Sequence, residues 1–351
     1  MTHQRRLHLL FRQLIFGLVA GCAAVGATAE QAPEPLLQQI SDAMHTLDYQ
    51  GTLVRSVDGK LHTLRVAHRN QDGVSTEKLV TLDGEQREIV RVGNELVCLW
   101  PQRRLKFVDK TASPSNAFAR LPAVAQKIGQ FYELVALGND RIAGRDALRY
   151  FIRPKDAFRY GHSLWVDSET LLPLRMQLLN AKQVVEEIRF TDVTIGAAIA
   201  DDDLRSTIDD TGFELVQAGV TTVDRLVASS PALQARAANG ETLLNETDSR
   251  SGFSLSGMQG EMVEVNGRQV TRFEYSDGIA TVSVFVAAGS GAPGGKHGKM
   301  GATHSYQRSN GHSTMTLVGE VPLATLRMLA EQADRQLNSL ERVAPAATAT
   351  E

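Results

Sequence analysis

Motifs that could carry chemistry occur in this sequence, but each lacks a member that its chemistry needs. Gly295 and Lys296 are placed like the end of a phosphate-binding loop, whereas Ser290 replaces the first glycine of that loop and His297 replaces the serine or threonine that binds magnesium. Residues 252–256 begin like a G-x-S-x-G nucleophile elbow, but they end on serine and lie in a strand pattern. We therefore predict neither a phosphate cradle nor an activated serine.

Cysteine and histidine are too sparse for a nucleophile or a metal site. Cys98 lies in the apolar run 96–100, where a free cysteine is expected to be buried core rather than a reactive thiolate. His297, His304 and His312 flank a glycine-rich segment and could approach one another, but metal sites usually recruit cysteine or carboxylate at closer spacing. The sequence thus predicts no catalytic residues, no metal, no cofactor, and a protein that is not an enzyme.

Five arginines make the region 141–159 locally basic within a chain whose formal net charge is −3. The overall charge gives no basic field of the kind that nucleic-acid-binding proteins carry. A solvated face explains such a run of cationic side chains, and a patch for an acidic peptide or a lipid phosphate is the functional alternative. The candidates for that anion-binding patch are Arg141, Arg145, Arg149, Arg153 and Arg159.

The first residues have the architecture of an export signal. Three arginines precede a short apolar stretch, and residues 27–29 form an Ala-x-Ala cleavage site. We predict a signal peptide over residues 1–29 and a mature protein that is soluble in the periplasm. Residues 18–22 also resemble a lipobox, which would instead attach a lipid to Cys22. Cleavage at the first site leaves a single cysteine, so the mature monomer would have no internal disulfide.

Hydrophobic periodicity predicts the elements that follow. Apolar residues recur at helical spacing over residues 35–47, which predicts an amphipathic helix. The period then changes to two, with Asp-Gly turn signals at nearly even intervals, which is typical of a meander of antiparallel hairpins. A second, kinked helix is expected over residues 115–128, because Ser115 is a good N-cap and Pro122 lies inside the pattern.

Two later segments alternate apolar and polar residues, as half-buried strands with one apolar face do. The apolar members are expected to share one buried face. These residues are Leu174, Met176, Leu178, Ile188 and Phe190.

The pattern weakens after residue 199, where aspartates mark a solvated stretch, and we place a domain boundary there. The second domain is again rich in strands, contains a mobile glycine-rich hairpin loop at 289–301, and ends in a helix after Pro322. The fold class is α+β, mostly antiparallel β. The predicted limits are a signal peptide over 1–29, a first domain over 30–200, a linker over 201–225, a second domain over 226–341 and a disordered tail over 342–351.

Five blocks of sequence, in order, resemble the MucB/RseB family. They are residues 47–54 (LDYQGTLV), 141–145 (RIAGR) and 159–167 (RYGHSLWVD) in the first domain, and 275–285 (YSDGIATVSVF) and 318–322 (VGEVP) in the second. The resemblance covers nearly the whole mature chain. It departs between about residues 220 and 248, which lack the tryptophan-containing, proline-glycine entry usual in the family.

The resemblance implies a first domain similar to the LolA/LolB fold, a strongly curved antiparallel half-barrel with helices on its concave side. The cavity of that fold accepts acyl chains, so the five apolar residues of the two alternating segments become candidates for a lipid cavity. The smaller second domain would be an antiparallel sheet with a terminal helix.

The resemblance also implies a function. Members of the family bind the periplasmic domain of a membrane-spanning anti-sigma factor and shield it from a site-1 protease, and lipid or lipopolysaccharide releases the shield. We expect such a negative regulator of an envelope-stress (sigma-E/AlgU-type) pathway, with no nucleic-acid partner and with homo-oligomer formation left open. The alternative is a periplasmic lipid or lipoprotein carrier that uses the same cavity. The second domain favours the regulator, because a carrier of this fold needs only one domain.

Overall fold

The computed structural model describes residues 33–110, 128–181, 183–217, 251–255, 261–265, 268–288, 294–309 and 313–343. Ala32–Glu351 belongs to one compact unit. Several predicted features lie outside the described residues. These are the signal peptide with Cys22, nearly all of the kinked helix at 115–128, the stretch at 220–248 and the tail after residue 343.

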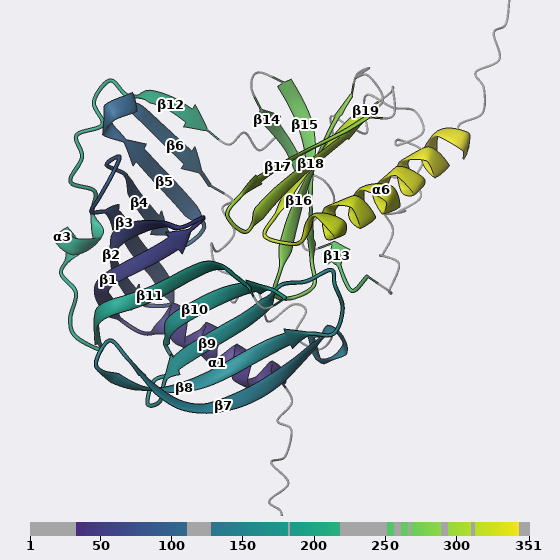
Figure 1. Cartoon of the computed structure of the whole chain (residues 1–351). Helices are drawn as coiled ribbons and strands as arrows, with labels where there is room; N and C mark the ends of the chain where they lie inside the picture. Colours follow the sequence, from purple (N-terminus) through teal and green to yellow (C-terminus); the bar gives the residue numbers. More distant parts are fainter. Residues whose placement is uncertain are drawn as a thin grey trace, which may run out of the picture. The chain divides into compact units, whose positions relative to one another are not determined.

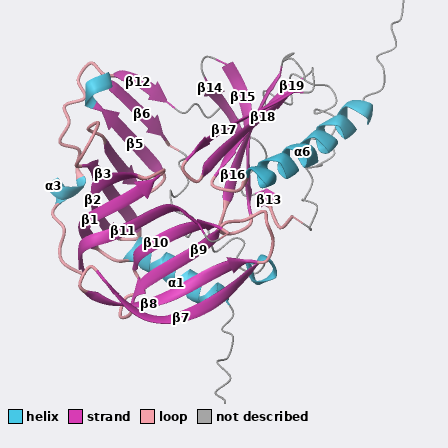
Figure 2. Ribbon diagram, in the orientation of Figure 1, coloured by secondary structure: helices cyan, strands magenta, loops and turns pink. Residues whose placement is uncertain are grey.

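A twelve-stranded sheet is built from the first part of the chain (Figure 1; Figure 2). Its strands are β1 (Tyr49–Val57), β2 (Lys60–Gln71), β3 (Val74–Thr81), β4 (Glu88–Val92), β5 (Glu95–Trp100), β6 (Leu105–Asp109), β7 (Tyr132–Ile142), β8 (Arg145–Pro154), β9 (Gly161–Asp167), β10 (Pro173–Asn180), β11 (Gln183–Ile195) and β12 (Glu214–Gln217). The order is β12-β6-β5-β4-β3-β2-β1-β11-β10-β9-β8-β7, so the sheet does not close on itself. All neighbours are antiparallel except β12, which pairs with β6 in parallel.

Asp-Gly pairs close the first two hairpins, as the sequence predicts. Asp58 and Gly59 join β1 to β2, and Asp72 and Gly73 join β2 to β3, with φ of 49°, 74°, 54° and 81° in that order. Positive φ at both central residues matches the twist of the flanking strands, and glycine adopts it without strain. Local sequence therefore sets the register of these hairpins.

The helix α1 (Pro33–Thr46) lies against the β7–β10 part of this sheet (Figure 1). It matches the helix predicted at 35–47. Leu37 and Ile40 are completely buried, and they belong to one apolar cluster with Ile152 of β8 and Leu164 of β9. The helical stripe and the alternating strands thus bury the same set of side chains, which is the main source of stability for such a layer.

The second sheet follows the pattern of its sequence. It contains β13 (Ser254–Leu255), β14 (Glu261–Val265), β15 (Arg268–Ser276), β16 (Thr281–Ala288), β17 (Gly294–Met300), β18 (Thr303–Ser309) and β19 (Ser313–Gly319), in the order β13-β15-β16-β19-β18-β17 with β14 also paired to β15. The helix α6 (Leu323–Val343) begins after Pro322 as predicted. Its Leu326 and Leu329 pack in one cluster with Val284 and Leu317 of the sheet.

The predicted fold class is confirmed, since both sheets are mostly antiparallel, the first is open, and the smaller second sheet carries a terminal helix. One expectation was wrong: the segment 289–301, predicted as a mobile hairpin loop, contributes β17, which pairs along its length with β18. Two glycines of β17 lie close to side chains of β18. A Cβ on Gly295 or Gly298 would lie 2.9 Å from Tyr306 Oη or Ser305 Oγ, respectively.

Part of the segment 201–225, expected to be a linker, contacts the first sheet. The short helix α3 (Asp201–Leu204) buries Leu204, and β12 extends the sheet by pairing with β6. Ser206, between these two elements, donates its hydroxyl to the carboxylate of buried Glu88 of β4 at 2.6 Å, which fixes the segment to the first sheet. Of the aspartates that signal a solvated stretch, Asp210 is half-buried and pairs with Lys106, and the others are exposed, yet the backbone follows the sheet. The limits of the domains remain a prediction.

Candidate functional site

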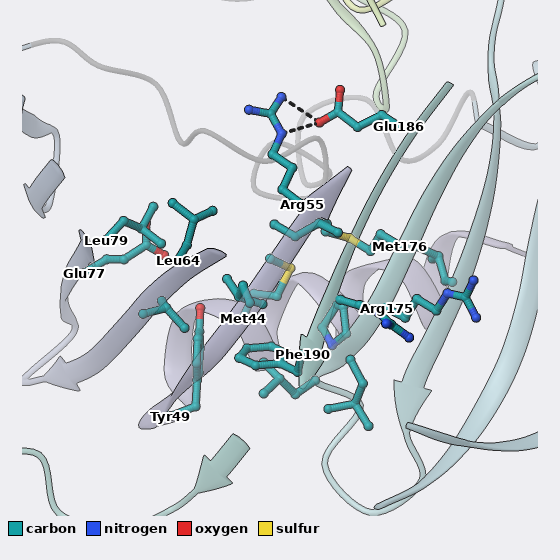
Figure 3. A pocket seen from close by; sticks show the side chains of 18 of the residues that line it. Met44, Tyr49, Arg55, Leu64, Glu77, Leu79, Arg175, Met176, Glu186 and Phe190 are labelled. Carbon is teal, nitrogen blue, oxygen red and sulfur yellow. Dashed lines mark hydrogen bonds and ion pairs between the residues drawn. The ribbon is translucent and has the colours of Figure 1, made fainter. Parts of the chain in front are cut away.

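A cavity of about 360 Å³ lies on the face of the first sheet that α1 covers (Figure 3). All five apolar residues that the sequence assigns to one face line it. These are Leu174, Met176 and Leu178 of β10, and Ile188 and Phe190 of β11. Met176 lies directly opposite Ile188 in the register of the two strands, so both strands present apolar side chains to the same space. The structure brings the five residues together, and their use for lipid remains a prediction.

The other half of the cavity comes from segments that the sequence did not connect with it. Met44 of α1, Leu53 of β1, Leu64 of β2 and Leu79 of β3 line it. Alternation along these strands signals an apolar face, but only the pairing of β1 with β11 brings that face beside Ile188. A concave lining of this kind suits a ligand that is itself largely apolar.

Charged side chains line the cavity at several places, and at one of them Arg55 pairs with Glu186 (Figure 3). Arg55 Nε and Nη2 each lie 2.7 Å from Glu186 Oε1. Glu320, in the turn that follows β19 of the second sheet, also lines the cavity. The residue is exposed, but desolvation by the surrounding protein and the nearby Glu186 carboxylate raise its pKa. Arg87 lines the wall without an ion pair to another described residue. A cavity lined by both apolar and charged groups suits an amphiphile, a molecule with an apolar tail and a polar head.

Desolvation favours the neutral forms of titratable groups in and beside the cavity wall. Burial lowers the pKa of His162 to about 4, so its imidazole is neutral near pH 7. Burial also raises the pKa of Glu77 and lowers that of His68. The His68 ring stacks on Tyr49 with 4.8 Å between the ring centroids. The cavity wall therefore carries less charge near pH 7 than the number of its titratable residues suggests.

The five arginines expected to form an anion-binding patch do not all lie on an exposed surface. Four of them contact groups of the first sheet: Arg141 the Gly144 carbonyl, Arg145 the Asp167 carboxylate, Arg149 the Trp165 ring and Arg153 the Glu133 carboxylate. The fifth, Arg159, is completely buried and cannot belong to a surface patch. Anion binding by the other four remains a prediction.

Arg159 instead joins the two sheets. Its Nε donates to Asp277 Oδ2 at 2.7 Å, and neither side chain is exposed. Tyr132 of β7 donates its hydroxyl to the same oxygen at 2.8 Å. The guanidinium also lies over the rings of Phe131 and Phe253, 4.4 and 5.0 Å from their centroids. The buried charges are thus paired and hydrogen-bonded, the condition under which a protein interior tolerates them.

Two of the sequence blocks that carry the family resemblance meet here, the block that begins at Arg159 and the block that contains Asp277. Asp277 Oδ1 accepts the N–H of Ala280 at 2.8 Å, so the side chain that pairs with the first sheet also shapes the turn between β15 and β16. Tyr160 donates its hydroxyl to the Ala302 carbonyl of the second sheet at 3.3 Å. These blocks serve packing between the sheets.

Cys98, His304 and His312 are among the residues considered above for a nucleophile or a metal site. Burial raises the pKa of the Cys98 thiol, and Cys98 lies in β5 as predicted. His304 Nδ1 contacts the Val321 carbonyl at 2.8 Å, while His312 lies outside the described residues. Over the ranges that the structure describes, no three His, Cys, Asp or Glu side chains are grouped to hold a metal ion. No helix in those ranges has both the length and the apolar character needed to cross a membrane.

Known protein families match this chain over the residues of both sheets. A family model described as MucB/RseB N-terminal domain matches residues 32–208, and one described as MucB/RseB C-terminal domain matches residues 244–334. The sigma factor AlgU regulatory protein MucB of Pseudomonas aeruginosa is 31% identical over 321 residues, which cover 89% of this chain and 94% of that protein. The sigma-E factor regulatory protein RseB of Haemophilus influenzae is 28% identical, with 93% of this chain and 98% of that protein covered.

Solved structures give the same result. The complex structure of Pseudomonas aeruginosa MucA and MucB contains a chain 27% identical to this one, with a TM-score of 0.61 and coverage of 85% of this chain and 96% of that chain. The crystal structure of MucB aligns at 27% identity and a TM-score of 0.52, covering 84% and 94%. Because most of each chain is covered, the likeness includes both sheets.

Proposed function

This chain belongs to the MucB/RseB family of sigma factor regulatory proteins, and from that premise we propose that it binds the periplasmic domain of a membrane anti-sigma factor. Binding would shield that domain from site-1 proteolysis, because a segment held against another protein leaves the pool accessible to a protease. A lipid or lipopolysaccharide that prefers the unbound state would shift the population back and release the partner.

The observation that carries this proposal is the ordered match of both domains to relatives that are seen with such a partner. The similar solved chains include MucB in complex with MucA and with its periplasmic part. In this chain the Arg159–Asp277 pair ties the two sheets, so residues of both can form one binding surface. We propose an equivalent partner for this chain.

The cavity supports the lipid part of the proposal. Its lining combines the apolar side chains of β10 and β11 with charged groups that include the Arg55–Glu186 pair and Arg175, which fits a lipid tail and its headgroup. If lipid and partner favour different arrangements of the protein, linkage requires that each weaken the affinity of the other by the same factor, typically about 5–150-fold.

We also propose that the protein acts in the periplasm after removal of residues 1–29, with a lipid on Cys22 as the alternative. Mass spectrometry of the native protein decides between them. A mature chain that begins at Glu30 and carries no lipid is expected, and an acylated Cys22 would replace the soluble form with an anchored one.

A periplasmic lipid or lipoprotein carrier is the second candidate, and the cavity is the observation that favours it. A carrier would load and deliver its cargo through the same lining. It would have no need of the second sheet or of the buried contacts that join it to the first, and for this reason we rank it below the regulator.

The deciding experiment is titration of the purified mature protein with the periplasmic domain of its anti-sigma factor, with and without lipopolysaccharide fragments or phospholipid. We expect binding at micromolar concentrations or below, and weaker binding when lipid is present. Absence of partner binding at micromolar concentrations would favour the carrier. Partner binding that is unaffected by lipid would keep the regulator and remove the lipid response.

A further inference from the structure

Among the described residues that line the cavity, Glu320 is the one that comes from the second sheet's turns: it lies directly after β19 and is exposed to solvent. It follows Gly319, the last residue of β19, and precedes Val321, which is completely buried in the core of the second sheet. The Val321 carbonyl accepts a hydrogen bond from His304 of β18 at 2.8 Å. The backbone on both sides of Glu320 is therefore fixed to the second sheet, while its side chain lines a cavity of the first.

Glu320 shares its end of the cavity with one cation and a second carboxylate. Arg55 of β1 pairs with Glu186 of β11 at 2.7 Å, and the Glu186 side chain is only 15% exposed. Desolvation by the surrounding protein raises the pKa of Glu320, the Glu186 charge raises it further, and the Arg55 charge lowers it. Arg87, Arg175 and Arg189 also line the cavity, but Glu186 and Arg55 are the charges that act on Glu320. A further negative charge beside Arg55 would therefore be repelled by both carboxylates.

We propose that Glu320 makes the second sheet sensitive to the charge on the headgroup of an amphiphile bound in the cavity. An apolar tail would occupy the lining formed by β10 and β11, with the headgroup at the Arg55 end. An anionic headgroup competes with the carboxylates for Arg55 and repels Glu320, and an uncharged headgroup does neither.

An anionic ligand therefore favours an arrangement in which Glu320 is withdrawn from the cavity. Because the backbone on both sides of Glu320 is held in the second sheet, a withdrawal larger than a side-chain rotation moves that sheet, and a partner held by both sheets then loses affinity. The inference rests on the proposed function, since it assumes that the cavity takes an amphiphile and that a partner binds.

The test compares two amphiphiles that share a tail and differ in headgroup charge, dodecyl phosphate and dodecyl maltoside, both below their micelle-forming concentrations. Calorimetry measures the affinity of the full mature protein for the periplasmic domain of its partner as each amphiphile is added, and amphiphile binding is measured separately. The variant is Glu320→Gln. The matched control is Glu331→Gln, which neutralises an exposed carboxylate of α6 that does not line the cavity.

In the unaltered protein, dodecyl phosphate should weaken partner binding at least about fivefold, and dodecyl maltoside should bind with less than about twofold effect. The Glu320→Gln variant should bind dodecyl phosphate at least as tightly as the unaltered protein, because a repulsive charge is gone. In this variant, dodecyl phosphate should change the affinity for the partner by less than about twofold. Glu331→Gln should match the unaltered protein.

The inference would be overturned if dodecyl phosphate weakened partner binding as much in Glu320→Gln as in the unaltered protein, or if the two amphiphiles weakened it equally. Either result would leave a lipid-responsive regulator intact. Failure of both amphiphiles to bind the unaltered protein would overturn the proposed lipid response itself.

Discussion

Arg159 and Asp277 lie 118 residues apart in the chain and form an ion pair of 2.7 Å in which neither side chain reaches solvent. The Tyr132 hydroxyl donates to the same carboxylate oxygen. The first sheet thus supplies the cation and a neutral donor, and the second sheet supplies the acid. If the partner is held by both sheets, this cluster is part of what presents them together.

Replacing Arg159 by methionine should destabilise the protein by about 3–5 kcal/mol, because the Asp277 carboxylate would remain buried without its cation. Arg153→Met is the control. It breaks a pair with Glu133 whose side chains are 53% and 35% exposed, and it should cost less than about 1 kcal/mol. Urea unfolding followed by tryptophan fluorescence gives both values. Equal stability of the two variants would show that the buried pair does not tie the sheets.

Tyr132→Phe removes one hydrogen bond to the same carboxylate and leaves the ring in place. We expect a loss of about 1.5–3 kcal/mol, the usual range for a hydrogen bond to a charged group. Tyr150→Phe on the neighbouring strand removes a hydroxyl that has no hydrogen-bond partner among the described residues, and it should change stability by less than about 0.5 kcal/mol. A small and equal effect of both changes in urea unfolding would contradict this role for Tyr132.

The five candidate cavity residues should differ in their contribution to folding. Phe190 is 6% exposed and meets the Tyr49 ring edge-on at 6.3 Å, so Phe190→Ala should cost about 3–5 kcal/mol. Met176 is half-buried and lines open space, so Met176→Ala should cost less than about 2 kcal/mol, the low end for such changes. Chemical denaturation of the two variants measures the difference. A larger loss for Met176 would mean that it is packed core and not cavity wall.

Filling the cavity should weaken amphiphile binding without unfolding the protein. Leu178→Trp places a larger apolar side chain in the open space and should weaken binding of dodecyl phosphate at least about tenfold, with a stability change of no more than about 1–3 kcal/mol. Val184→Trp makes the same kind of change at a position that is 49% exposed and outside this cavity, and it should leave binding unaltered. Calorimetric titration of both variants measures the effect. Undiminished binding by Leu178→Trp would place the ligand elsewhere.

Stability should fall as the pH is lowered through the range set by His162. Burial lowers its pKa to about 4 from the ordinary 6.5, so between these values the unfolded chain binds a proton that the folded chain does not. The full difference corresponds to about 3 kcal/mol, at about 1.36 kcal/mol per pKa unit. Thermal melts from neutral pH to pH 4 should show a shallower decline in His162→Gln. Because the raised pKa of Glu77 acts in the opposite direction, the comparison with the variant isolates His162. Identical pH profiles would remove His162 as the cause.

Local patterns in the sequence determined several elements of this protein. The spacing of apolar residues predicted α1, and the Asp-Gly pairs predicted the turns of the first hairpins, because helical periodicity and positive φ depend on neighbouring residues alone. The period of two along β10 and β11 likewise predicted that Met176 and Ile188 share a face, since a strand sends alternate side chains to opposite sides.

Tertiary structure alone decided the rest. In the sequence, Arg159 and Arg153 lie in the same basic run. In the structure, the Arg159 side chain is completely buried, whereas that of Arg153 is 53% exposed. The sequence also gives no sign that Glu320 would line a cavity of the first sheet. The free energy of a charged group depends on the partners that surround it in the folded state. For Arg159 those partners include Asp277, and the chain brings them together only when the whole fold is in place.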